Sequence, residues 1–386
     1  MKKWLLVATV AILALSTIPL IPRDRPVPIV SLSHAVANPL QDGRRARTLS
    51  VEDYLRAYGI DELQSRGLSG DGVTVVVPAI DTYVPSDLRK FRSLNDLPPF
   101  DIVEEGSPSS GASFGELPMD LQIIHAVAPA ARLVVAHWPR YTDSDAGLIQ
   151  RIAKKYPAAV WSWSIGWCEE GDAQYTRDVA GALGRTVEAG SAHFAASGDS
   201  GGYDCYPSGK LFDPPKRDYI GLIMPSSAPA VTSVGGTRVL ADKQGNLVKE
   251  TPWYRSVTLS GSGGGASEVF DGRTVPDVAG NADPATGMAF LLNGEVYSAG
   301  GTSASTPLWA GLAALIEQAL KEEKLQRRGD FNSLLARVAK DAPEAFRHPR
   351  VGSNAVAVAG NGRDRVTGWG AANAPVLVEA AVRASR

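Results

Sequence analysis

The hydrophobic positions of the chain follow two alternating periods, and this alternation predicts the fold. Runs of consecutive apolar residues, typical of strands buried on both faces, occur at 72–80, 132–138, 158–165, 192–197 and 231–235. Apolar residues at helical spacing predict helices at 51–63, 145–155, 173–188 and 331–339, one from Glu116 to just before Pro129, and a long one from near Ser303. We therefore expect an α/β fold with a doubly wound, mostly parallel sheet and helices on both faces.

The N-terminal stretch does not share this pattern. Lys2 and Lys3 precede an apolar run over 4–21, and small residues at 35–37 offer a cleavage site for an export signal. Residues 1–37 are interpreted as that signal, with an uncleaved membrane anchor at 4–21 as the alternative. Residues 38–50 are a linker, and 51–386 form one domain without a large prodomain before it. In either case the domain faces the outside of the cytoplasm.

Charge and cysteine content narrow the possible partners and the compartment. The chain has 39 Lys and Arg against 41 Asp and Glu, a net charge of −2, so nothing electrostatic favours binding to nucleic acid. Its two cysteines, Cys168 and Cys205, suit an oxidising compartment. We expect one disulfide, with two free buried thiols as the alternative, and a monomer.

Small residues at 298–302 lead into the helix that begins near Ser303. A serine at this point has its N–H at the positive end of the helix dipole, which suits a nucleophile and the oxyanion that its attack creates. Pro307 fits because proline is tolerated in a first helical turn. A Ser/Thr-rich helix cap without chemistry is the alternative.

A serine nucleophile needs a base, and carboxylates are better placed than histidines. None of the histidines lies in a His-Gly-Thr-type turn that opens a helix; they are His34, His125, His137, His193 and His348. Glu116 and Asp120 are four residues apart, so they share a helical face, where close carboxylates can share a proton. Glu116 would bond Ser303 and Asp120 would orient Glu116; acids favoured by the helix dipole are the alternative.

Asp199 supplies a third carboxyl group. It follows the buried strand at 192–197, so it lies at the C-terminal end of a strand, where sites of parallel sheets form. A neutral carboxylic acid there can donate a hydrogen bond to an oxyanion. The alternative is a turn aspartate, which the surrounding Gly-Asp-Ser-Gly suits.

With these residues assembled, the chain from about Val51 to its C-terminus resembles the sedolisin family, serine-carboxyl peptidases on a subtilisin-like fold. The matching strings are Glu-x-x-x-Asp at 116–120, Ser-Gly-Asp-Ser-Gly at 197–201 and Gly-Thr-Ser-x-Ser-x-Pro at 301–307. The resemblance implies Ser303 as nucleophile, Glu116 as general base, Asp120 as its partner and Asp199 as oxyanion donor. It implies hydrolysis of peptide bonds through an acyl-enzyme. The optimum should be acidic, because a carboxylate is the base and Asp199 must stay protonated.

The resemblance also assigns a substrate pocket and raises the question of a metal. The pocket would be lined by Ser162, Ser164, Gly166, Gly263, Gly264 and Gly265, although Ile165 replaces the family's tryptophan. The family's calcium site is matched by Gly360, Gly362 and Asp364, but His348 stands where a second Asp is expected. Imidazole is a poor calcium ligand, so we expect no calcium and no cofactor for the chemistry.

Two further strings resemble other protease families, and three functions are compatible with these residues. Ser200 lies in a string like that of trypsin-like proteases, but those are double β-barrels. Asp81 resembles the catalytic Asp strand of subtilisin, but Glu116 stands where the subtilisin histidine should be. The leading function is an exported endopeptidase acting in acid. A tripeptidyl-peptidase of the same mechanism and a non-catalytic peptide-binding protein remain open.

Overall fold

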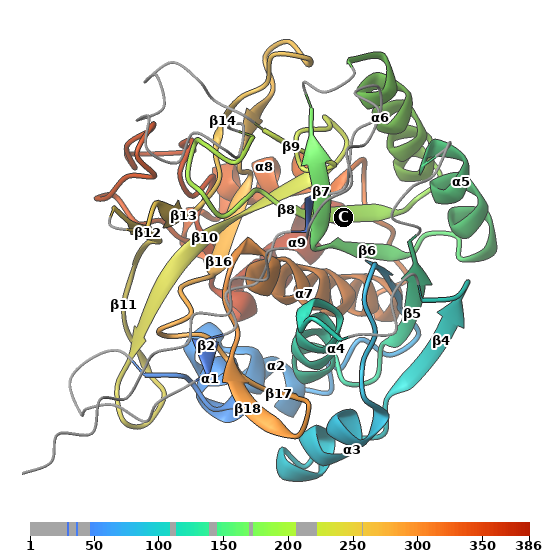
Figure 1. Cartoon of the computed structure of the whole chain (residues 1–386), viewed down its shortest axis with the longest axis vertical. Coiled ribbons are helices and arrows are strands. Elements are labelled where there is room, and N and C mark those ends of the chain that lie inside the picture. The colour runs from blue at the N-terminus through green and yellow to red at the C-terminus, as the bar shows by residue number, and fades with distance from the viewer. Residues whose placement is uncertain are drawn as a thin grey trace, which may run out of the picture.

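The apolar runs form one large central sheet. The computed structural model describes residues 29–30, 36–37, 47–108, 113–138, 145–169, 173–205, 222–256 and 258–386. Within them the sheet has ten strands. In order across the sheet these are β19 (Phe346–Arg347), β20 (Ala371–Ala372), β16 (Val278–Asn281), β10 (Thr232–Ala241), β8 (Ala192–Ala196), β6 (Val160–Trp163), β3 (Thr74–Ala79), β5 (Arg132–His137) and β4 (Asp101–Glu105), with β11 (Leu247–Pro252) beside β10 (Figure 1).

The direction of the strands confirms the predicted fold class. From β4 to β20 each neighbouring pair is parallel, whereas β11 and β19 are antiparallel to their neighbours. Smaller sheets flank one end of the large sheet. Two of them have three strands: one consists of β1 (Ile29–Val30), β7 (Ile165–Cys168) and β9 (Ile223–Met224), and the other of β2 (Val36–Ala37), β17 (Ala289–Leu292) and β18 (Glu295–Ser298). Two more have two strands each, β12 (Tyr254–Arg255) with β13 (Ser260–Gly261), and β14 (Gly265–Ala266) with β15 (Thr274–Val275).

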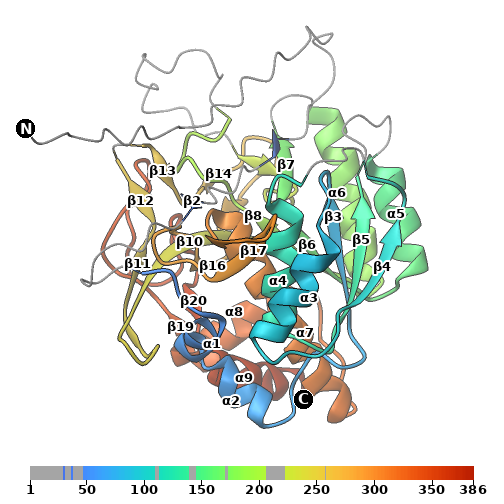
Figure 2. The same cartoon turned by 60° about the horizontal axis from the view of Figure 1, so that its bottom comes forward.

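Helices cover both faces of the sheet, as the alternating pattern predicted. Val75 and Val77 of β3 point into the larger core, whereas Val76 between them points into the smaller one. The larger core includes α1 (Val51–Tyr58), α2 (Ile60–Ser65), α3 (Pro85–Leu94), α4 (Glu116–Val127), α7 (Thr302–Glu322), α8 (Phe331–Asp341) and α9 (Ala374–Ser385). The smaller core packs under α5 (Asp145–Lys155) and α6 (Ala173–Glu188), on the other side of β3, β5 and β6 (Figure 2).

Two predicted elements are interrupted. The helix predicted at 51–63 is two helices, because Gly59 adopts φ 74°, a left-handed conformation that ends α1. The strand predicted at 158–165 stops at Trp163, and after Ser164 the chain continues as β7, which pairs with β9 instead of the central sheet. Both interruptions keep the apolar pattern intact, so the pattern alone did not reveal them.

The predictions for the N-terminal signal and linker lie mostly outside the described residues. Of residues 1–46, only 29–30 and 36–37 are described, as β1 and β2. In the described part of the chain, every helix is too short or too polar to cross a bilayer.

Candidate active site

The strands bring the predicted site residues to one end of the sheet. Asp81 follows β3, Ser164 follows β6 and Asp199 follows β8, and these three strands are parallel. The N-termini of α4 and α7, which carry Glu116 and Ser303, lie at the same end, and the two helices pack against each other. This is the edge where ligand sites of parallel sheets form.

Glu116, Asp120 and Ser303 form a buried cluster. Their exposed fractions are 4%, 1% and 0%. The Ser303 hydroxyl is close enough to the Glu116 carboxyl to lower its pKa, yet neither Glu116 oxygen meets strict hydrogen-bond geometry with a described group. No hydrogen bond between Ser303 and Glu116 is formed in this structure, and hydrogen bonds of this kind often tighten only around substrate.

Ser164 connects Asp120 to the backbone of the candidate nucleophile. Its hydroxyl is 2.9 Å from Asp120 Oδ1 and 3.3 Å from the Ser303 carbonyl oxygen. That carbonyl is available because Pro307, four residues on, has no N–H to donate to it. In return, Ser303 Oγ is 3.5 Å from the carbonyl oxygen of Ser164. Because α7 begins at Thr302, Pro307 lies in the second turn of the helix and not in its first turn as predicted.

The electrostatic surroundings favour a shared proton between Glu116 and Asp120. Burial raises the pKa of Glu116 well above its usual range, and the charges of Asp120, Asp81 and Asp199 raise it further. Burial also raises the pKa of Asp120, and the Asp81 charge adds to this rise, whereas the Ser164 hydroxyl lowers it. Two such carboxyls in one dry site hold at least one proton at acidic pH.

Asp199 is held at the beginning of α7. Its Oδ1 accepts hydrogen bonds from the N–H of Thr302 at 2.7 Å and from the Thr302 hydroxyl at 2.8 Å. Its Oδ2 faces Gly301, where an added Cβ would lie 2.4 Å away. The carboxyl group is thus beside the residue that precedes Ser303, which suits a donor to an oxyanion formed at Ser303.

The described histidines have other partners. His125 stacks on Phe100, with 3.7 Å between the ring centroids, and His193 bonds Trp163 and Thr186. His137 bonds Glu104 at the end of β5. The interpretation of these histidines as core or surface residues is therefore confirmed; His34 lies outside the described residues.

Three of the four predicted pocket glycines are required by close packing. A Cβ on Gly263 would lie 2.1 Å from the Ser197 carbonyl oxygen, and one on Gly264 would lie 2.1 Å from that of Arg365. A Cβ on Gly166 would lie 2.4 Å from Ile223 and from the Met224 carbonyl oxygen, so this glycine lets β9 approach β7. These glycines therefore have a packing role whether or not they contact substrate.

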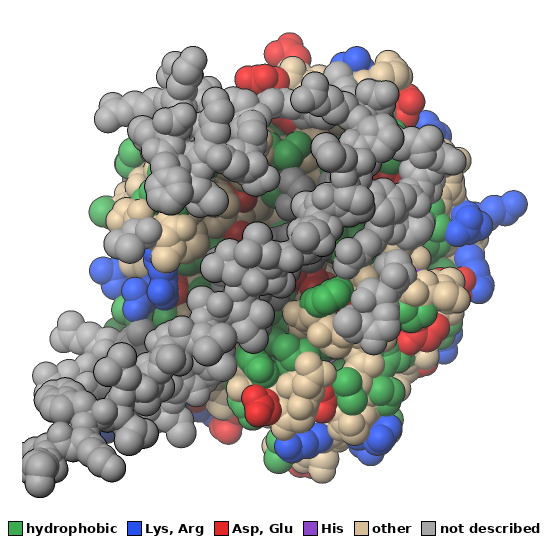
Figure 3. All heavy atoms as spheres, in the orientation of Figure 1, with side chains coloured by type: hydrophobic (Ala, Val, Ile, Leu, Met, Phe, Trp, Pro, Cys, Tyr) green, Lys and Arg blue, Asp and Glu red, His purple; other side chains and the backbone are tan. Residues whose placement is uncertain are grey.

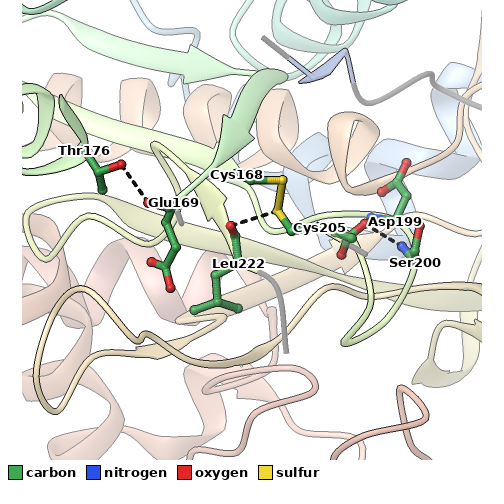
Figure 4. The surroundings of a disulfide bond; sticks show 8 residues. Cys168, Glu169, Thr176, Asp199, Ser200, Cys205 and Leu222 are labelled. Carbon is green, nitrogen blue, oxygen red and sulfur yellow. Dashed lines mark hydrogen bonds between the residues drawn. A yellow bond between two sulfur atoms is a disulfide. The ribbon is translucent and has the colours of Figure 1, made fainter. Parts of the chain in front are cut away.

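The predicted disulfide is present. Cys168 at the end of β7 is bonded to Cys205, which follows the loop that carries Asp199 and Ser200 (Figure 4). The bond thus joins the strand of the predicted pocket to the loop of the candidate oxyanion donor. Ser200 has its N–H bonded to Asp204.

The Asp364 carboxylate of the predicted metal site is bonded to backbone N–H groups. Asp364 Oδ1 accepts the N–H groups of Val366 and Thr367, and Oδ2 accepts that of Gly360. His348 Nε2 lies 3.5 Å from the same Oδ2. In the described ranges no three His, Cys, Asp or Glu side chains gather as a metal-binding group. The carboxylate oxygens are therefore directed at N–H donors, and calcium prefers a shell of six to eight oxygens.

Three polar residues of the site were not assigned a role from the sequence. Asp81 accepts the N–H of Leu117 at 3.1 Å with Oδ1, and so caps α4, whose first residues have no cap of their own. Burial raises the pKa of Asp81 to about 6. Thr302 holds Asp199, and Asp204 holds the backbone beside it. The acid at the end of β3 was a visible signal for Asp81; nothing similar marked the other two.

The fold that carries the cluster of Glu116, Asp120 and Ser303 is shared with a known protein family. The model described as "Subtilase family" matches residues 107–370, so the chain belongs to the subtilase family. Kumamolisin of Bacillus sp. (strain MN-32) is 32% identical over 66% of this chain and 49% of its own length. Sedolisin of Pseudomonas sp. (strain 101) is 27% identical over 74% of this chain and 53% of its own length. Within the subtilases, the chain is a member of the sedolisin family.

A solved structure shares the fold of this chain. It is titled "Pseudomonas sedolisin (serine-carboxyl proteinase) complexed with two molecules of pseudo-iodotyrostatin", and it matches with a TM-score of 0.75 at 24% identity. The match covers 87% of this chain and 98% of that chain, which confirms the predicted fold. The chain spans about half the length of the two curated relatives.

Charge on the visible face fits the near-neutral composition. Figure 3 shows Lys and Arg side chains in separate groups toward the edges of this face, with acidic side chains between them. No continuous basic surface is visible among the coloured residues of this view. The absence of a nucleic-acid partner stays a prediction.

Proposed function

We propose that the protein is an exported serine-carboxyl endopeptidase that acts in acid. The observation that carries the proposal is that Ser303, Glu116 and Asp120 are buried together where α4 and α7 pack against each other, while the described histidines are bonded elsewhere. Glu116 takes the proton of Ser303 as the hydroxyl attacks a peptide carbonyl, and Asp120 shares the charge of the base. An acyl-enzyme forms, the amine leaves with a proton from Glu116, and water then hydrolyses the ester.

Two groups support the charge that develops on the substrate oxygen. The N–H of Ser303 lies at the positive end of α7, and the neutral carboxyl of Asp199 donates a hydrogen bond. The rate should fall at low pH, where the base is fully protonated, and at higher pH, where Asp199 ionises. The optimum is therefore acidic.

An extended substrate would pair with the outer edge of β7. In the structure this edge is paired antiparallel with Ile29 and Val30, which supports its capacity to accept an added strand. The other edge of β7 is taken by β9. Main-chain pairing gives affinity at such an edge, and side-chain pockets give preference.

The decisive experiment compares the wild type with Ser303→Ala on a long peptide at about pH 4. We expect cleavage by the wild type and a loss of at least about a thousandfold in the variant, with an unchanged melting temperature. The cleavage map separates internal cuts from release of tripeptides. Equal activity of both proteins, or an optimum near pH 8 that collapses below 5, would refute the mechanism; peptide binding without cleavage would favour the non-catalytic function.

We also propose that the fold does not depend on calcium, because Asp364 is bonded to N–H groups and His348. A chelator should leave the melting temperature of the protein within about 1 °C, and added calcium should not raise it. A drop with chelator that calcium reverses would show that the loop at 360–364 does bind the ion.

A further inference from the structure

The loop that carries Asp199 is held by the side chain of Asp204. Oδ1 of Asp204 accepts the N–H of Asp199 and the N–H of Ser200, both at 2.7 Å. Each bond is made to the backbone, so the two bonds fix the path of the main chain at 199–200. The other oxygen, Oδ2, is buried and has no hydrogen-bond partner among the described groups.

Gly198 leaves the space that this carboxyl group occupies. A Cβ on Gly198 would lie 2.2 Å from Asp204 Oδ2 and 2.4 Å from its Cγ, closer than side-chain atoms pack. Gly198 also has φ 117°, a conformation that favours glycine. The contact between Asp204 and the loop therefore depends on the glycine of the Ser-Gly-Asp-Ser-Gly string.

The main chain next to Asp204 is anchored by a disulfide bond. The next residue, Cys205, is joined to Cys168 on β7 (Figure 4). Thr302, at the beginning of α7, holds the Asp199 carboxyl with its N–H and hydroxyl. The main chain and the side chain of Asp199 are thus fixed by different residues.

We infer that Asp204 is a positioning residue, which holds the main chain at 199–200 so that the Asp199 carboxyl meets an oxyanion formed at Ser303. The inference rests on the proposed function. An error of about 1 Å in the placement of a catalytic group can reduce a rate a hundredfold, so an anchor of this kind affects turnover more than substrate affinity.

The protonation state of Asp204 suits this role in acid. Burial raises the pKa of Asp204 to about 8, and the charge of Asp199 adds to the rise, whereas the two backbone N–H groups and the Ser200 side chain lower it. The carboxyl is therefore neutral at acidic pH. An asparagine, which is neutral and keeps Oδ1 as an acceptor, should replace it well there.

The test compares three variants with the wild type at about pH 4. Asp204→Ala should lower kcat about tenfold to a hundredfold with KM within about twofold, whereas Asp204→Asn should stay within about threefold in kcat. Asp242→Ala is the matched control, because Asp242 Oδ1 also accepts two N–H groups, those of Gln244 and Asn246, in the exposed turn between β10 and β11. It should leave kcat unchanged.

A second readout separates positioning from general loosening. A peptide aldehyde forms a tetrahedral adduct with a catalytic serine and so depends on the oxyanion donors, whereas a product peptide does not. In Asp204→Ala the aldehyde Ki should rise by the factor by which kcat/KM falls, and the product Ki should stay constant. An equal rise in both constants, or an unchanged kcat, would overturn the inference. An inactive wild type would instead refute the proposed function, and the inference with it.

Discussion

Among single residues, Glu116 has the surroundings that most directly specify a chemical role. Its carboxyl is buried at the first position of α4, in contact with the Ser303 hydroxyl and near the charges of Asp120, Asp81 and Asp199. Each of these charges raises the pKa of Glu116, and the hydroxyl lowers it. The Glu116 carboxylate is therefore a stronger base than that of a free glutamate. At a given pH, a smaller fraction of it is ionised.

Two isosteric substitutions test this arrangement. Glu116→Gln removes the base and should lower kcat by about a hundredfold to ten-thousandfold. Asp120→Asn should cost less, and should move the acidic limb of kcat/KM to lower pH, because loss of the Asp120 charge lowers the pKa of Glu116. The measurement is the pH–rate profile of each variant on one peptide. A limb that moves to higher pH would contradict the assumed sign of the coupling.

Site residues that belong to short sequence motifs could be predicted from the sequence. Site residues whose contacts join distant parts of the chain could not. Glu116 and Asp120 could be paired because helical spacing places them on one face. Asp81 contacts residues 114–117 across more than thirty positions, and no local pattern encodes that contact. The catalytic roles of Ser303, Glu116, Asp120 and Asp199 stay predictions until activity is measured.

Among the elements, β7 is the one whose geometry depends most on a glycine. Gly166 pairs with Ile29 on one edge of β7, while a Cβ on it would collide with β9, which pairs along the other. The run of apolar residues predicted one strand over 158–165 in the central sheet, whereas the structure has β6 in that sheet and β7 over Ile165–Cys168 outside it. The turn at Ser164 that sends β7 out of the sheet has no hydrophobic signature, so the period alone could not locate it.

Replacement of two glycines by alanine distinguishes this packing role from a general effect of glycine. Gly166→Ala should destabilise the protein by about 1–3 kcal/mol, since β9 must move to admit the methyl group. Gly184→Ala, in α6, meets nothing within 4 Å and should stabilise by about 0.5–1 kcal/mol. Chemical denaturation of both variants gives the comparison. Equal effects on the two free energies of unfolding would exclude the proposed contact.

For the whole molecule, buried carboxyl groups link stability to pH. The pKa of Asp81 is raised to about 6 and that of Asp204 to about 8, both from an unfolded value of 3.8. The folded protein therefore keeps protons that the unfolded chain has lost, so the stabilisation is complete below about pH 4 and is lost as pH rises through 6 and 8. The lowered values of Asp53, Glu105 and Asp242 act with the opposite sign in strong acid. Burial also lowers the pKa of His125 to about 4 and that of His193 to about 3, so these two histidines destabilise the folded protein as pH falls below about 6.5.

Calorimetry at about pH 7 and pH 8 tests this linkage, because His125 and His193 are neutral there in both the folded and the unfolded chain. The melting temperature should be lower at pH 8, by roughly 2–4 °C for each 1 kcal/mol of lost stability. Asp204→Asn cannot ionise, so it should reduce the slope between about pH 7 and 8. A melting temperature that is constant or rises over this range would show that other groups dominate.

The long helix that begins at Thr302 is weakened at Pro307, a residue that costs an internal helical position about 3 kcal/mol relative to alanine. Engineering for heat resistance that follows helix propensity alone would select that position first. The exchange would also supply a main-chain donor to the Ser303 carbonyl, in competition with Ser164. Replacement of Pro307 should therefore raise the thermal stability of the protein and lower its turnover rate.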